Sequence, residues 1–575
     1  MTEVPGPAAQ AVSNASDVFH KPWLWLGAGA LVYLSFGFTE MMGSDLWWHL
    51  AAGREIVQTG TIWLVDDWSY TEYGSPWRNH EWLADLIFFA WAKLLGVPSL
   101  VYWKWLLIVS SFTVLQNALT RLSGCPAAAL LACILGVVLA APFLDMRPQL
   151  YSLLGVAILF KLSLLRRARL RELLPLFLVW VNLHGGFIFG LMLLAILEFP
   201  WRSLSLVTVR SAVLRVLACA AVCLLNPDGL RVFWLPLVYA LDSASPYRSL
   251  AEWRSPFVDG GIRSSLYVYS LMIAAASSLL WVLPAVRRAV IFLPEAVALG
   301  LLTAAMSSTS RRFIILWAFA VALLMTPFIA ALLRQRLLQL ALPLVLLATF
   351  ATAAIRLAPY SWRSEVAYHY LTAEYAYPHA VADFIELNDL QGKTFAYYNW
   401  GGFLHWRGDG ALKVYLDGRA NTLFDDQTYL DYVSVLAAQP GWLQRIENSG
   451  AEFFLWPRTR GGQRLIRGLL DTRRWRLLYQ DARGVLLARK SLDLPARLKI
   501  PRGTAMTELA LAYSAFKRAD YPLASRAVEQ AYAQRPWDYE VCVWRKRTLQ
   551  ALGRSEEAEA SLQACADWFP SKYLR

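Results

Sequence analysis

The chain has 575 residues, of which 57% are hydrophobic and 17% are charged, and its mean hydropathy is +0.38. This composition excludes an ordinary soluble globular protein, because too few polar side chains remain to cover the surface of so long a chain. The formal net charge of +13 does not indicate a nucleic-acid partner, since many basic residues lie in short loops between apolar runs. The composition predicts a protein whose partner is a lipid bilayer.

Apolar runs fill the first two thirds of the chain, and a membrane span needs roughly 20 mainly apolar residues. About eleven spanning helices are predicted on this basis, at 23–42, 99–120, 125–143, 149–165, 172–184, 186–200, 211–225, 264–283, 289–307, 313–333 and 337–355. The polar segment 1–22 lacks the architecture of a cleavable signal and is predicted to be a cytoplasmic tail. Residues 23–356 are therefore predicted to form a polytopic α-helical membrane bundle.

The segment 82–97 is apolar enough to span a membrane, but it is short and is interrupted by Asp85 and Lys93. If it lies on the membrane surface, nearly all basic loops fall on one side of the bilayer, as the positive-inside rule requires. We therefore predict an interfacial helix here. The outer side then receives a large first loop, 43–98, the turn 144–148, the break 184–186, the stretch 226–263, the segment around 308–312, and everything after about residue 356.

The C-terminal third is predicted to be soluble and to contain two parts. Residues 357–495 alternate helical stretches with short β-rich runs, which favours a small α/β domain. Within 500–575, pairs of residues recur at the 34-residue period of tetratricopeptide repeats, namely Ala519 and Gly553, Ala524 and Ala558, Val528 and Leu562, Ala531 and Cys565, and Pro536 and Pro570. Two repeats are few for a stable array, which predicts support from the α/β domain or from a protein partner.

Cys542 and Cys565 lie about equally far from the turn at Gly553, so the predicted hairpin places them opposite one another. Two alternatives remain open for this pair. The cysteines are bridged if the domain lies in an oxidising compartment, or they are packed as small core residues.

The first outer loop, 43–98, carries most of the candidate chemistry. Asp45 follows the first span directly, and an acidic residue there is costly unless it is solvated or used. The alternative is that Asp45 caps a helix beginning at Leu46. Trp48 and His49 follow as candidate substrate-binding residues. Four further polar residues either line an acceptor entrance or organise turns, namely Asp66, Asp67, His80 and Glu81.

The order of these features resembles the GT-C superfamily of membrane glycosyltransferases, which includes protein mannosyltransferases, aminoarabinose transferases and oligosaccharyltransferases. The shared order is a span, an acidic residue, an aromatic cluster, the sequence G-x-I-x-x-x-D-D-W-S-Y-T-x-x-G-x-P-W and an amphipathic helix. Three more motifs resemble a bacterial branch of that superfamily, namely W-x-N-x-H-G-G at 180–186, N-P-x-G at 226–229 and E-W-x-S-P at 252–256.

The resemblance implies a glycosyltransferase of the bacterial cytoplasmic membrane that uses a polyprenyl-phosphate sugar donor, with the α/β domain on the periplasmic side. It also implies that a carboxylate of the first outer loop acts at the reaction centre, and by position this is Asp45. The acceptor is a glycan, a lipid or a protein. The chain departs from the oligosaccharyltransferases in having Asp145-Met146-Arg147 where they hold a divalent metal with a D-x-D pair. A divalent metal therefore stays open as an alternative that no D-x-D motif supports, and no metal ligand or cofactor is assigned.

Transfer from a lipid phosphate also needs cations to hold the departing phosphate, and arginine offers a planar, permanently charged fork of donors. Arg147, Arg311 and Arg312 lie at predicted outer ends of spans, against the positive-inside trend. The alternatives for each are interfacial snorkelling or an ion pair with Asp145 or Glu252.

Three features of the outer side have both a functional and a structural interpretation. His184 and Asn182, beside the break at Gly185-Gly186, either bind substrate or act as structural hydrogen-bonding residues. The turns 398–402 and 417–419 form a lid or acceptor-recognition surface, or they are buried turn architecture. Two further functional classes remain as alternatives to the transferase, namely a flippase for lipid-linked glycans and a non-catalytic scaffold for envelope assembly.

Overall fold

The structure is a computed structural model of the chain. It describes residues 21–38, 43–234, 244–258, 265–290, 293–357, 376–481, 483–536 and 538–566. The predicted tail, 1–22, lies almost wholly outside these residues. The chain divides into two compact units, which we call the helical unit (Met1–Thr39 and Tyr102–Leu357) and the mixed unit (Glu40–Val101 and Ala358–Arg575).

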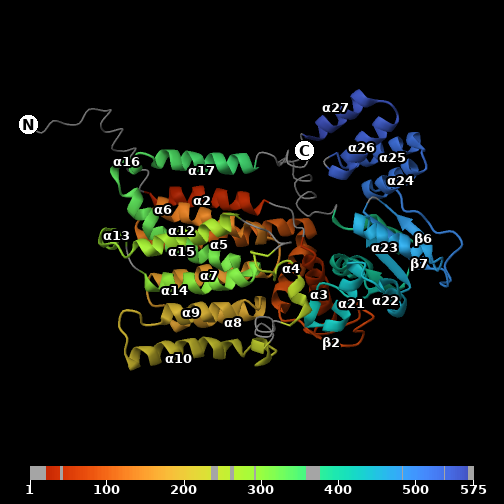
Figure 1. Ribbon diagram of the computed structural model, residues 1–575. Helices are drawn as coiled ribbons and strands as arrows, with labels where there is room; N and C mark the ends of the chain where they lie inside the picture. Colours follow the sequence, from red (N-terminus) through yellow and green to blue (C-terminus); the bar gives the residue numbers. More distant parts are fainter. Residues whose placement is uncertain are drawn as a thin grey trace, which may run out of the picture. The chain divides into compact units, whose positions relative to one another are not determined.

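Every apolar run predicted from the sequence forms a helix (Figure 1). These helices are α2 (Pro22–Gly37), α5 (Leu100–Ser123), α6 (Pro126–Ala140), α7 (Gln149–Leu164), α8 (Leu170–Leu183), α9 (Phe187–Glu198), α10 (Leu206–Cys223), α12 (Ser265–Leu280), α14 (Pro294–Thr309), α15 (Ile314–Leu333) and α17 (Leu342–Leu357). Shorter helical turns occur between them, at η2 (Ala141–Phe143), η3 (Pro246–Ser249), α13 (Pro284–Ala289), η4 (Arg311–Phe313) and α16 (Arg336–Gln339).

Four helical stretches of the described chain are long and apolar enough to cross a membrane, namely Val97–Ser123, Pro126–Phe143, Leu206–Cys223 and Arg311–Leu333. Most of the other predicted spans are helices of 12 to 16 residues. At 1.5 Å per residue they are about 18 to 24 Å long, which is short of a hydrocarbon core of about 30 Å. The structure therefore shows a mostly helical chain with some membrane-spanning candidates, and the prediction of about eleven spans goes beyond what helix length shows.

Helix α15 forms the centre of the helical unit, and α6 and α14 pack against it. Nearly all of its side chains are buried, including Phe319 and Leu323 at 0% exposure. Gly136 of α6 permits the close approach, because a Cβ atom there would lie 2.9 Å from the backbone oxygen of Ala318. Small residues at such crossings are typical of helices packed in membranes, where close van der Waals contact drives association.

The mixed unit contains a five-stranded sheet of order β4-β3-β5-β7-β6. Its strands are β3 (Gly392–Ala396), β4 (Leu412–Val414), β5 (Phe453–Pro457), β6 (Trp475–Gln480) and β7 (Gly484–Arg489). β3 is parallel to both β4 and β5, whereas β7 is antiparallel to β5 and β6. The accompanying helices are α19 (His379–Leu387), α20 (Gly401–Gly408), α21 (Asp426–Leu436), α22 (Trp442–Asn448) and α23 (Arg460–Asp471). The prediction of a small α/β sheet domain is confirmed.

The first outer loop folds as part of this sheet domain. It contains α3 (Asp45–Thr59), the hairpin of β1 (Trp63–Val65) and β2 (Pro76–Arg78), α4 (Trp82–Leu95) and η1 (Val97–Ser99). The segment after β1 pairs in parallel with edge strand β4, where the Val414 N–H donates to the Trp68 oxygen at 2.9 Å and the Tyr70 N–H donates to the Val414 oxygen at 3.1 Å. Residues 40–101 therefore belong to the mixed unit, although the sequence analysis placed them within the membrane bundle.

Helix α4 coincides with the segment 82–97, and at 14 residues it is not among the spanning candidates. It packs closely against α3, and only a glycine fits at position 53, because a Cβ atom there would clash with the backbone oxygen of Asp85. The Asp85 carboxylate, which interrupts the apolar run, is fully buried and is hydrogen-bonded to His49 at 2.6 Å and to Asn79 at 2.7 Å. That this helix lies on the membrane surface stays a prediction.

The chain continues from the sheet domain into two helical hairpins, formed by α24 (Ala505–Lys517) with α25 (Tyr521–Gln534) and by α26 (Tyr539–Ala551) with α27 (Ser555–Ala566). The 34-residue period is visible in the backbone, because Ala519 and Gly553 are both left-handed, with φ of 59° and 75°. Ala524 and Ala558 are both fully buried, as expected of small residues where paired helices cross. Pro570 lies outside the described residues.

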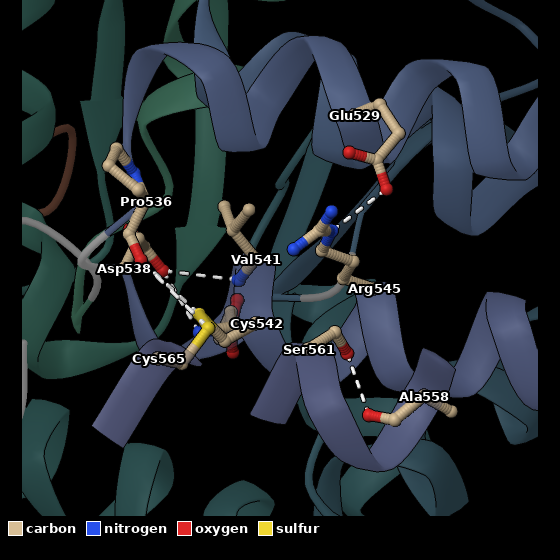
Figure 2. The surroundings of a disulfide bond; sticks show 10 residues. Glu529, Pro536, Asp538, Val541, Cys542, Arg545, Ala558, Ser561 and Cys565 are labelled. Atoms are coloured by element: carbon tan, nitrogen blue, oxygen red, sulfur yellow. Dashed lines mark hydrogen bonds and ion pairs between the residues drawn. A yellow bond between two sulfur atoms is a disulfide. The ribbon is translucent and has the colours of Figure 1, made fainter. Parts of the chain in front are cut away.

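Cys542 and Cys565 form a disulfide between α26 and α27, with their Cα atoms 6.3 Å apart (Figure 2). Of the two alternatives that the sequence left open, the structure therefore has the bridged one. The bond is buried, at 1% and 0% exposure of the two residues. Disulfides persist in oxidising compartments and are rare where thiols are kept reduced.

The disulfide predicts how many cysteines react with an alkylating reagent. Alkylation of the denatured, unreduced protein should modify four cysteines, namely Cys125, Cys133, Cys219 and Cys223. Prior reduction should raise the count to six, read by intact-mass spectrometry. The variant Cys565→Ser releases Cys542, so about five thiols should react with or without reductant. Six reactive thiols in the unreduced wild type would contradict the disulfide.

Candidate functional site

Asp45 lies in the first turn of α3, which begins at Asp45 itself after the N-cap residue Ser44. The prediction that Asp45 caps a helix beginning at Leu46 is therefore wrong by one position. Its carboxylate accepts a hydrogen bond from the Ser44 hydroxyl at 3.2 Å, and the first turn of a helix favours a negative charge because the backbone N–H groups there are unpaired. The carboxylate is thus held near the end of a rigid element.

Two turns of the sheet domain pack on this first turn of α3, and glycine makes both approaches possible. A Cβ atom at Gly418 would lie 3.2 Å from the Asp45 carboxylate and 3.0 Å from the Trp48 indole nitrogen. A Cβ atom at Gly402 would lie 2.9 Å from the Trp48 backbone nitrogen. The turns 398–402 and 417–419, predicted as a recognition surface or as buried turn architecture, therefore lie beside the candidate base.

Trp48 is 8% exposed, and its indole N–H has no hydrogen-bond partner among the described residues. Its ring lies 3.6 Å from that of His49 and meets Trp77 edge to face. An unpaired buried N–H costs about 1 to 3 kcal/mol, so such groups in native proteins usually have a reason. Here the free donor and the Asp45 carboxylate border the same glycine.

His49, one turn after Asp45 on α3, lies among several charged side chains. The His49 Nδ1 atom is 2.6 Å from Asp85, and its Nε2 atom is 3.9 Å from Glu81. Burial lowers the pKa of His49, but Asp85, Glu81 and Asp45 raise it, and the net pKa lies above the ordinary value. His80 lies 3.8 Å from the other Glu81 oxygen. Glu81 is 7% exposed and buried with His49, so the structure places both in a polar core rather than at an open entrance.

Asp66 is bound to a buried arginine. The Arg419 guanidinium lies 2.7 Å from Asp66 and 2.8 Å from Asp417, and all three side chains are fully buried. Its carbon lies 4.1 Å from the centre of the Trp68 ring. Although burial lowers the pKa of Arg419, the two carboxylates raise it, so the guanidinium remains charged. Asp66 thus organises the turn and joins the loop to the domain, and at 1% exposure it does not line an entrance.

Asp67 is exposed and, with Glu55 and His405, is one of three residues whose donor atoms lie within 4.8 Å of one another. Burial lowers the pKa of His405 to about 3, so its imidazole is neutral. Burial also raises the pKa of Glu55, against the Trp68 hydrogen bond and the charges of Arg419 and Arg54. These are the residues of the described chain that could hold a metal ion.

The arginines predicted to bind phosphate gather around one carboxylate in the helical unit. Arg147 lies 2.9 Å and Arg312 lies 3.3 Å from the two oxygens of Glu252. Arg311 is buried and donates to the backbone oxygens of Ala251 and Ser255. The E-W-x-S-P motif thus contacts all three arginines, and the ion-pair alternative with Glu252 is observed for Arg147 and Arg312 but not for Arg311. Asp145 instead accepts from the Met146 N–H at 2.7 Å.

His184 and Asn182 make structural hydrogen bonds that join the remaining motifs. The His184 Nδ1 atom lies 2.6 Å from the Ser152 hydroxyl, which also accepts from the Trp180 indole at 2.7 Å. The Asn182 side-chain oxygen accepts from Asn226 at 3.1 Å. The W-x-N-x-H-G-G and N-P-x-G motifs therefore contact each other, which supports the structural interpretation of both residues.

The sequence analysis did not single out Glu55 or His405. They are 350 positions apart, so no spacing or local motif connects them. Arg419 was noticed only as part of a tight turn. Its carboxylate partners come from a loop and a domain that the sequence assigned to different parts of the protein.

Shortening the buried side chain of Arg419 is expected to lower the free energy of unfolding strongly. Arg419→Met leaves Asp66 and Asp417 buried without their cation, which should cost about 3 to 5 kcal/mol. The control Arg407→Met removes a partly exposed arginine of the same domain, paired with Asp383, and should cost less than about 1 kcal/mol. The measurement is the thermal unfolding midpoint in detergent, by near-ultraviolet circular dichroism. Equal midpoints for the two variants would contradict the assignment.

A comparison with protein-family models finds no match to this chain, and a comparison with curated proteins finds no relative.

Proposed function

We propose that the chain is a membrane glycosyltransferase that moves a sugar from a polyprenyl-phosphate donor to an acceptor hydroxyl at the outer face of the bacterial cytoplasmic membrane. Asp45 is the general base in this proposal. The observation that supports it most is the surroundings of Asp45, a carboxylate at the start of α3 beside a glycine and the unpaired indole N–H of Trp48. A base and a hydrogen-bond donor are what hydroxyl activation needs.

The reaction forms a bond between the acceptor oxygen and the anomeric carbon and breaks the bond between that carbon and the phosphate oxygen. The acceptor proton passes to the Asp45 carboxylate, and the bonding electrons leave with the phosphate. The Trp48 N–H donates to an oxygen of the bound sugar or acceptor. A Cβ atom at Gly418 would crowd both groups, so glycine is what permits the close approach of this turn to them.

The proposal assigns the departing phosphate to Arg147, Arg312 and Arg311. Two of these guanidinium groups, those of Arg147 and Arg312, share one carboxylate, Glu252. In this proposal Glu252 orients the guanidinium groups of Arg147 and Arg312. Arginine suits phosphate binding because its N–H donors match phosphate oxygens in pairs. The assignment to the same side of the membrane as Asp45 rests on the positive-inside argument.

The proposed architecture is a bundle of about eleven spans with the mixed unit outside the cytoplasm. The helices at every predicted apolar run support it. The disulfide of the mixed unit supports the location in an oxidising compartment such as the periplasm. The short helices are accommodated if the bundle locally thins the bilayer. The two helical hairpins are proposed to bind a protein partner.

The base is tested by Asp45→Asn, which keeps the shape of the side chain but removes its proton affinity. Transfer of radiolabelled sugar from a polyprenyl-phosphate donor to cell-envelope acceptors should fall at least about 100-fold, the scale of general-base catalysis. The matched control is Asp426→Asn, which removes an aspartate from the first turn of α21 in the same unit and should leave transfer unchanged. Full transfer by Asp45→Asn would end the assignment of Asp45 as the general base.

The topology is tested with a reporter enzyme that is active only outside the cytoplasm, fused after Arg356. The reporter should be active there and inactive when fused after Arg288, in a basic loop proposed to be cytoplasmic. An inactive reporter after Arg356 would mean that the number of spans is wrong by an odd number, and the outer-face site would be abandoned.

A further inference from the structure

We propose that Glu55, Asp67 and His405 bind a divalent transition-metal ion, which fastens the first outer loop to the sheet domain within the mixed unit. The three ligands come from separate elements. Glu55 lies on α3, Asp67 follows β1, and His405 lies on α20. One imidazole and two carboxylates form a mixed nitrogen and oxygen set of the kind that zinc accepts.

The geometry needs little adjustment to close around an ion. The His405 Nε2 atom already lies 3.0 Å from the Glu55 Oε1 atom, and all three donor atoms lie within 4.8 Å of one another. Bonds of about 2.0 to 2.2 Å place the donors of one zinc ion roughly 3 to 4 Å apart. The Asp67 side chain is exposed, so it can rotate by the remaining distance without disturbing the core.

The charges around the cluster leave room for a cation. Within the described residues, neither Glu55 nor Asp67 forms an ion pair with a lysine or an arginine. Three cations lie near the cluster and have partners of their own: Arg419 is bound to Asp66 and Asp417, Arg54 to Asp409, and Lys413 to the backbone oxygen of Asp67. The two carboxylates lie with the imidazole inside one 4.8 Å group, and a divalent ion would balance their charge.

His405 supplies an independent observation. Its side chain is 4% exposed, and its Nδ1 atom has no hydrogen-bond partner in the described part of the chain. The ring stacks on Trp68 at 4.1 Å between centroids, and the Trp68 indole N–H donates to Glu55. One tryptophan thus orients two of the three ligands, as outer-shell partners of metal ligands do. The buried imidazole thus directs its Nε2 atom at Glu55, where the ion would bind, and its other nitrogen is unpartnered within the residues that the structure describes.

The site is separate from the proposed reaction centre. Glu55 lies ten residues after Asp45 on the same helix, which is about 15 Å at 1.5 Å per residue. An ion there touches no reacting atom in the proposed transfer. It would instead fix the C-terminal half of α3 against α20, because its ligands join segments 350 positions apart. The inference therefore does not rest on the proposed function, and it holds or fails whether or not Asp45 is a base.

The experiment uses the full chain purified in detergent and stripped with EDTA. Titration calorimetry with Zn²⁺, with metal content by mass spectrometry, should show one ion per chain. Asp67→Asn and His405→Gln should each weaken binding at least about 10-fold, the effect expected for altering a metal site. Asp493→Asn, an exposed aspartate elsewhere in the same unit, is the matched control and should bind as the wild type does. Because Asp67 is exposed, its variant should keep its fold.

A second readout separates this site from adventitious binding by cysteine. Co²⁺ in place of Zn²⁺ should give visible absorption bands without the near-ultraviolet bands of thiolate ligands. Hydrogen exchange of the α3 and Trp68 segments should slow on addition of Zn²⁺ in the wild type and not in Asp67→Asn. Absence of stoichiometric binding, equal affinity of the wild type and both ligand variants, or thiolate bands with Co²⁺ would each overturn the proposal.

Discussion

The buried guanidinium of Arg419 lies between two carboxylates, one from the first outer loop and one from the sheet domain. A buried charge needs partners, and Asp66, Asp417 and the Trp68 ring supply them for Arg419, whose Nη1 atom alone has no hydrogen-bond partner among the described residues. Because Asp66 also accepts hydrogen bonds from Ser69 and Trp68, the same ion group sets the turn that aligns the loop with β4. The mixed unit depends on this group, since without it the loop loses its anchor to the sheet.

The alignment of the first outer loop with β4 also determines what surrounds the start of α3. Once the loop is aligned with β4, the turns 398–402 and 417–419 lie on the first turn of the helix, and glycines at 402 and 418 allow contact with Trp48 and Asp45. The carboxylate and the unpaired indole N–H then both lie beside Gly418. Ten residues further along the helix, Glu55 meets His405. One helix therefore carries both the candidate base and a candidate metal ligand, and the sheet domain completes the surroundings of each.

In the helical unit the short motifs make structural contacts with one another and with the three arginines. W-x-N-x-H-G-G and N-P-x-G hold each other through Asn182 and Asn226, and E-W-x-S-P encloses the three arginines. The arginine pair on Glu252 still differs from an ordinary ion pair. Two arginines share one carboxylate, and this clustering of guanidinium groups is the feature that the proposed phosphate site uses.

The sequence alone determined the location of each helix in the first two thirds of the chain, the α/β character of the extension and the 34-residue repeat, because all three depend on local periodicity and composition. It also identified Asp45 and both glycine turns as places of interest. Only the tertiary structure joined the loop to the sheet domain, selected the disulfide, and brought Glu55 to His405 and Asp66 to Arg419. The contact of Glu55 with His405 joins residues 350 positions apart, and the sequence allowed the two cysteines to be either bridged or merely packed. Such contacts are decided by burial and by the pairing of buried charges, and no local sequence pattern records either.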